Sequence, residues 1–119
     1  MDRDRRRPES HLPLRPVEFH VLLSLAAGER HGYGIIRDSA DRGDANPPDV
    51  GTLYRALARM SDQGLILKSR RRPAADAEDE RRNYYRVTEL GLRVARAEAR
   101  RLEVLTQAAR TGGLLEEPA

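Results

Sequence analysis

The stretch DVGTLYRALARMSDQG, residues 49–64, decides the fold of this 119-residue chain. Asp49 is a typical N-cap and Gly64 a typical C-terminal stop, so a helix is predicted between them. By the 100° step of a helix, one face carries the apolar side chains Val50, Leu53, Tyr54, Leu57 and Met60. The opposite face carries the polar side chains Thr52, Arg55, Arg59 and Gln63. We therefore expect one face to pack on a core and the other to meet a partner.

Two shorter helices are predicted before this segment. Apolar residues recur at helical spacing over 16–27, between a proline suited to the first turn and a glycine suited to the stop. A second helix is predicted over about 33–41, entered through His31 and Gly32. Residues 43–48 have the composition of a turn.

After Gly64 the apolar residues no longer recur at helical spacing. Residues 65–67 and 84–87 are predicted strands, which form a β-hairpin around a long, acidic, proline-bearing loop. Thr88 then caps a final helix of about 22 residues that ends at Gly112. Three helices, a hairpin and a long helix predict a mainly α protein with a small β-hairpin, namely a winged helix-turn-helix followed by a C-terminal helix.

Four segments are predicted along the chain. Residues 1–13 form a disordered arginine-rich arm, 14–88 a winged helix-turn-helix DNA-binding domain, 89–111 a dimerisation helix and 112–119 a flexible tail. A long helix with an apolar stripe needs a cover, and a second copy of the chain is the preferred one. The side chains expected at that interface are Leu90, Val94, Leu102, Leu105 and Ala109. The alternative is that this helix folds back on the first helix of its own chain.

Composition excludes several classes of protein. The chain has no cysteine, and its three histidines are too scattered for a metal site, so no cofactor or metal is expected. It contains no arrangement of residues typical of a nucleophile or a phosphate loop, so an enzyme is not expected. No apolar run is long enough to cross a membrane, and no signal-peptide layout is present, which predicts a cytoplasmic protein without a membrane partner.

Positive charge is concentrated on the predicted hairpin. The chain has 22 Lys and Arg against 19 Asp and Glu, and Lys68 is the one lysine among them. Basic blocks at 68–72 and 81–86 flank an acidic stretch at 74–80, whose role stays open. Arginine suits phosphates and guanine edges, although a GC-rich genome would also favour arginine at surface positions.

Four motifs resemble the PadR family of bacterial transcriptional regulators. They are HGY at 31–33, GTLYRAL at 51–57, GLI at 64–66 and YYRVTELG at 84–91. The order and spacing are similar to the compact branch of that family, which has a single C-terminal helix. The resemblance implies a dimeric repressor whose last helix packs against helices of the partner subunit.

The predicted DNA-binding residues are Gly51, Thr52, Tyr54, Arg55, Arg59, Arg81, Arg82 and Tyr84. The first five lie on the third helix, where arginines bond guanine edges or phosphates and a glycine lets backbone approach a phosphate. For Tyr54, core packing and a phosphate contact both stay open, and Arg55 and Arg59 could simply be solvated. The hairpin residues are expected to contact phosphates.

These observations predict a sequence-specific regulator that binds a palindromic operator in double-stranded DNA as a homodimer. A small-molecule effector near the dimer interface is a further expected partner, since such a ligand could favour one spacing of the two wings. The alternative is a protein–protein interaction module that uses the winged-helix surface.

Overall fold

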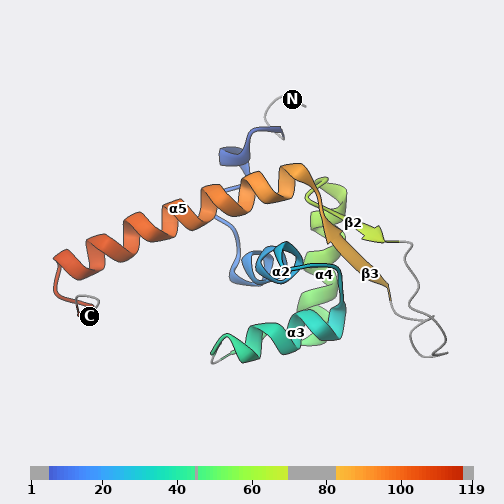
Figure 1. Ribbon diagram of the computed structural model, residues 1–119, viewed down its shortest axis with the longest axis horizontal. Coiled ribbons are helices and arrows are strands. Elements are labelled where there is room, and N and C mark those ends of the chain that lie inside the picture. Colours follow the sequence, from blue (N-terminus) through green and yellow to red (C-terminus); the bar gives the residue numbers. More distant parts are fainter. Residues whose placement is uncertain (1–5, 45, 70–82, 117–119) are drawn as a thin grey trace.

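The computed structural model describes residues 6–44, 46–69 and 83–116 (Figure 1). In chain order, these residues form η1 (Pro8–His11, a 3-10 helix), α2 (Pro16–Ala26), β1 (Arg30–His31), α3 (Gly32–Asp41), α4 (Val50–Asp62), β2 (Ile66–Ser69), β3 (Tyr84–Val87) and α5 (Glu89–Thr111). The mainly helical winged helix-turn-helix with a long last helix is thus confirmed. Among the described helices, none combines the length and the apolar character of a membrane-spanning segment.

The core lies where α2, α3 and α4 meet the sheet and the start of α5. Its buried apolar side chains include Val21, Leu22, Leu25, Ile35, Leu53, Leu57, Met60, Leu65, Ile66, Tyr85 and Val94. From α4 these are the residues of the predicted apolar face, except that Val50 and Tyr54 at its edges are exposed. Packing of that face therefore fixes which side of α4 points outward.

The sheet has three strands in the order β1-β3-β2, whereas the sequence predicted a two-stranded hairpin. β1 pairs antiparallel with β3, with Arg30 opposite Tyr85 and His31 opposite Tyr84. A strand of two residues has no measurable period, which explains why the pattern of side chains did not predict it. The added strand makes β3 the central strand. It connects the β2–β3 hairpin, here called the wing, to the start of α3.

A tight junction connects the wing to α5. Thr88 caps α5 by accepting a hydrogen bond from Gly91 N–H at 3.0 Å, and its hydroxyl also lies 2.7 Å from Gly64 O. Its backbone N–H donates to Leu65 O at 3.0 Å. A Cβ on Gly91 would overlap that same carbonyl oxygen, so only glycine permits this approach of α5 to Leu65, the residue before β2.

The N-terminal arm is more ordered than predicted. Residues 8–11 form η1, which contacts α5, and Leu12 packs partly against the core. The prediction of disorder is therefore wrong for residues 8–12, while 1–5 lie outside the described residues. Leu14 N–H donates to Glu98 Oε2 at 2.7 Å in a buried site, and this bond ties the start of the domain to α5.

Glu98 is the charged centre of this attachment. Its side chain is almost fully buried and also accepts a hydrogen bond from Arg101. The Arg101 hydrogen bond, together with Leu14 N–H, holds the pKa of Glu98 below its ordinary value despite burial. The ionised carboxylate is thus the form that the fold stabilises.

Candidate nucleic-acid interface

The outward face of α4 is the first part of the candidate interface. Its exposed residues are Gly51, Tyr54, Arg55, Ala58 and Asp62, and Thr52 is half-buried beside them. The opposite face is built into the core, so α4 presents these residues on a rigid support. This arrangement has the geometry of a helix that enters a major groove.

Gly51, Thr52 and Arg55 come together at the N-terminus of α4. The Asp49 carboxylate caps the helix by accepting from Thr52 N–H at 2.7 Å, and this hydrogen bond is the main cause that lowers the pKa of Asp49. Arg55 Nη2 donates to Thr52 Oγ1 at 3.3 Å. A Cβ on Gly51 would lie 3.2 Å from Arg55 Nη1, so the guanidinium lies over the glycine. The cation is thereby held beside the first turn of the helix.

Arg59 has a different environment from Arg55. Its Nε lies 3.8 Å from Glu18 Oε2 on α2, and its side chain is 34% exposed. Glu18 also accepts from Arg15 N–H at 2.8 Å and so helps to cap α2. The sequence placed Arg59 on the same open face as Arg55, but the structure places it at the border between that face and α2. Arg59 therefore faces the Glu18 carboxylate of α2, at a distance longer than a hydrogen bond.

Tyr54 brings the GTLYRAL motif at 51–57 into contact with the HGY motif at 31–33. A Cβ on the buried Gly32 would lie 2.7 Å from Tyr54 Oη, so the phenol packs directly on that glycine. The side chain is nevertheless 41% exposed. Tyr54 thus combines packing against the start of α3 with an accessible surface, and its contact with a phosphate stays a prediction.

Tyr84 lies on the wing and also packs against His31 at the start of α3. Its ring makes an edge-to-face contact with His31, with ring centroids 5.5 Å apart. His31 in turn caps α3 by accepting from Gly34 N–H at 3.1 Å, as expected for a structural residue at the start of that helix. Arg81, Arg82 and the acidic stretch at 74–80 lie outside the described residues.

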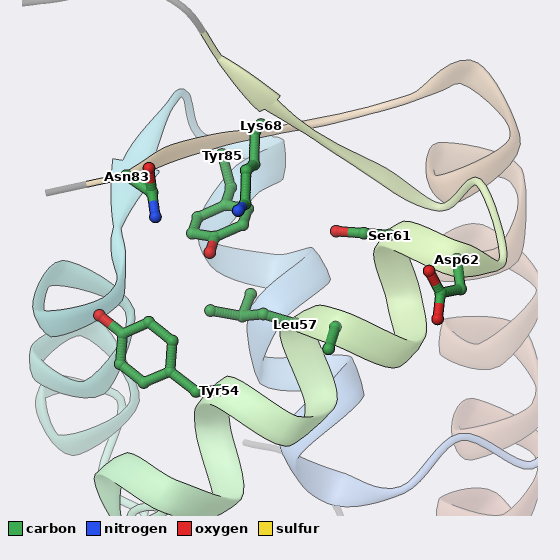
Figure 2. Close-up of a pocket in the computed structure, with 8 residues that line it drawn as sticks. Tyr54, Leu57, Ser61, Asp62, Lys68, Asn83 and Tyr85 are labelled. Carbon is green, nitrogen blue, oxygen red and sulfur yellow. The ribbon is translucent and has the colours of Figure 1, made fainter.

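A cavity of about 380 Å³ separates α4 from the wing (Figure 2). It is lined by Tyr54, Leu57, Ala58, Ser61, Asp62, Lys68, Asn83 and Tyr85. Of these, the sequence-based site included Tyr54 alone. Strand alternation could have placed Tyr85 on the face opposite Tyr84. The pairing of Tyr85 with Lys68 depends on the strand register, which the long intervening loop leaves undetermined in the sequence.

The predicted dimer residues fall into two groups. Val94 is fully buried in the core of its own chain, which leaves none of its surface for a partner, and Leu90 packs partly against that core. Leu102 and Ala109 are half-buried and Leu105 is 52% exposed. They belong to the part of α5 that extends away from the body of the domain (Figure 1). Val104, 68% exposed in the same part, was not predicted.

Comparison with protein families gives one match. A model described as the transcriptional regulator PadR-like family matches residues 21–97. Comparison with curated proteins gave no significant match.

Several solved structures are similar to this chain. A PadR family transcriptional regulator from Eggerthella lenta is 32% identical, with a TM-score of 0.60 and 82% of each chain covered. A transcriptional regulator from Clostridium thermocellum is 25% identical, with a TM-score of 0.65 and coverage of 80% of this chain and 90% of that one. A PadR family regulator from Clostridium difficile, 21% identical, shares the fold with a TM-score of 0.68 over 80% of this chain and 95% of its own.

Proposed function

Because this chain belongs to the PadR-like family and is thus a DNA-binding transcriptional regulator, we propose that it is a homodimeric repressor of a palindromic operator. In this proposal α4 enters the major groove and the wing lies along the flanking phosphates. Occupation of the operator blocks transcription.

One observation carries the proposal, namely the cluster of Gly51, Thr52 and Arg55 at the exposed N-terminus of α4. The N-terminus of a helix is electrostatically favourable for a phosphate, and the absence of a side chain on Gly51 lets the backbone approach one. Arg55 has the geometry to donate two hydrogen bonds to a guanine edge. We assign the contacts with base edges in the major groove to Arg55 and Thr52.

The remaining site residues are assigned to positioning the protein on DNA. Tyr54, Arg81, Arg82 and Tyr84 are proposed to contact phosphates, which fix the register without reading sequence. We assign Arg59 a smaller contribution to DNA binding, because its guanidinium also faces the Glu18 carboxylate.

The second half of α5 supports a homodimer. Its exposed side chains Val104 and Leu105 would be covered by the same surface of a second copy, as a two-fold interface requires. A two-fold dimer presents two α4 helices to half-sites about one helical turn of DNA apart, which matches a palindrome. An effector that binds near this interface and favours one spacing of the wings would release the operator.

Fluorescence anisotropy with DNA from the protein's own promoter region tests the proposal. We expect tight binding to this duplex relative to a shuffled one, and an affinity that falls steeply with salt, because several phosphates are neutralised. Arg55→Ala is expected to weaken binding to the promoter by roughly 5- to 150-fold and to reduce the preference over shuffled DNA.

Arg100→Ala is the matched control, since it removes the same charge from an exposed position on α5. Equal losses for both variants would mean that Arg55 contributes charge alone. Equal, weak binding of both duplexes by the wild type would contradict sequence-specific recognition and would favour the protein–protein interaction module.

A further inference from the structure

We propose that the cavity between α4 and the wing is a phosphate-binding site, with Lys68 and Tyr85 as hydrogen-bond donors. The inference deepens the proposed function, because a backbone phosphate of DNA is one source of the ligand. A free phosphate compound is the other source and would compete with DNA for the same residues.

The donors converge because of the strand register. Lys68 on β2 lies opposite Tyr85 on β3, so their side chains project from the same face of the sheet. Figure 2 shows both side chains directed into the space above α4, with Asn83 at the rim and Tyr54 on the helix below. The Tyr54 hydroxyl is directed away from them, toward Gly32 at the start of α3. The cavity volume of about 380 Å³ is ample for a phosphate and the group attached to it.

The Tyr85 hydroxyl is available to a ligand. Within the part of the chain that the structure describes, Tyr85 Oη makes no hydrogen bond. Tyr85 is only 4% exposed as a whole, because its ring is buried, but it lines the cavity, where its hydroxyl can donate to a ligand. Burial, and then the neighbouring Tyr54, raise the pKa of Tyr85, which therefore stays a neutral donor near pH 7. A phosphate oxygen would accept a hydrogen bond from this phenol.

The charges of the cavity place the anion at one end. Lys68 supplies an ammonium group beside Tyr85, whereas Asp62 lies at the opposite side of the cavity, beyond Leu57 and Ser61 (Figure 2). An anion near Asp62 would be repelled, so the phosphate is assigned to the end formed by Lys68, Tyr85 and Asn83. Tyr54 and Ala58, which belong to the exposed face of α4, also line the cavity, so a duplex along that face would run beside it.

Lys68 provides a direct assay, because it is the one lysine of the chain. The full-length protein is treated with an amine-acylating reagent at constant pH, and acylation of Lys68 is measured by mass spectrometry against the α-amino group. For a dissociation constant on the order of 1 mM, about 10 mM inorganic phosphate should slow acylation of Lys68 about tenfold. Sodium chloride at matched ionic strength should have no such effect.

Tyr85→Phe tests whether the hydroxyl takes part. This variant keeps the buried ring and removes the donor, so phosphate affinity should fall by roughly 2- to 12-fold with no loss of folding. Tyr33→Phe is the matched control, since Tyr33 is an exposed tyrosine that does not line the cavity. Equal phosphate affinity in the wild type and in Tyr85→Phe would overturn the role of Tyr85.

The response to inorganic phosphate decides the proposal, and the response to DNA identifies the source. Protection of Lys68 by phosphate and by promoter DNA supports a site for backbone phosphates. Protection by phosphate without DNA binding supports a site for free phosphate compounds and contradicts the proposed function. Absence of protection by phosphate overturns the site even where DNA binds through Arg55, so the two failures are distinguishable.

Discussion

The two halves of α5 have opposite relations to the rest of the molecule. Up to Glu98 the helix is built into the domain, through the Thr88 cap, the contact of Gly91 with Leu65 and the buried carboxylate. Beyond it, apolar side chains such as Val104 and Leu105 are exposed along a helix that projects from the body. One continuous helix therefore serves as core in its first half and as free surface in its second.

This difference shows that the sequence pattern of an apolar stripe does not indicate which surface packs against it. The sequence favoured a second copy of the chain as the cover for the stripe of α5 and left packing on the chain's own first helix as the alternative. The first part of the stripe, including Val94, is covered by the chain itself. Substitutions in the first half should therefore act on folding, and those in the second half on association.

The largest effect is expected from Gly91→Ala. The added Cβ overlaps the backbone carbonyl of Leu65, which cannot move away without separating α5 from β2. We expect a loss of more than about 3 kcal/mol in the free energy of unfolding, measured by urea denaturation followed by circular dichroism.

Gly112→Ala is the control at the other end of the helix, where the nearest atom to an added Cβ is Ala108 O at 3.4 Å. Its effect should stay within about 1 kcal/mol. Similar stabilities of the two variants would contradict the distinction between the halves.

Leu105→Asp tests the second half. Since Leu105 is 52% exposed in the single chain, its replacement should leave the fold intact. At a two-fold interface the change occurs twice, so we expect the dimer dissociation constant to rise by roughly 100-fold or more. Sedimentation velocity over a range of protein concentrations measures this, and a wild type that is monomeric throughout would refute the dimer.

A smaller loss is expected from Glu98→Gln. The substitution removes the charge that accepts from Leu14 N–H and Arg101, so stability should fall by about 2 kcal/mol. Glu103→Gln, in the exposed half of α5, should change stability by less than about 0.5 kcal/mol, measured in the same denaturation experiment. Equal effects of the two substitutions would show that Glu98 does not anchor the N-terminal segment.

The smallest expected effect is the pH dependence of the stability lost in Glu98→Gln. The pKa of Glu98 is lowered in the folded state by its hydrogen bonds with Arg101 and Leu14 N–H, so the unfolded chain binds this proton more readily. The stabilisation is therefore complete above the ordinary pKa of glutamate and is lost as pH falls through the lowered pKa of the folded state. The difference in stability between wild type and Glu98→Gln should shrink over that acidic range, and a constant difference would contradict the assignment.

Much of the fold was predictable because its signals are local. The Asp49 and Thr88 caps and the apolar spacing of α4 each act within a few residues, and the structure confirms both helix starts. The attachment of Leu14 to Glu98 joins residues 84 positions apart, and no local pattern encodes it.

The candidate site was predictable to a similar extent. Helical spacing brought Thr52 and Arg55 together correctly, but it could not show that Arg59 faces Glu18, since that contact depends on how α2 crosses α4. The cavity beside the wing depends on the pairing of Lys68 with Tyr85, which is a property of the folded sheet.

The contact between Gly32 and Tyr54 has a consequence for how related sequences diverge. A Cβ at position 32 would lie 2.7 Å from the Tyr54 hydroxyl, so a larger residue there requires the phenol ring to turn or to be replaced. Since Tyr54 is 41% exposed, its ring can turn, and alanine or serine at position 32 should be accepted most readily when the side chain at position 54 is also smaller. A library that randomises both positions at once and selects for folded protein would recover such pairs more often than the single changes at position 32.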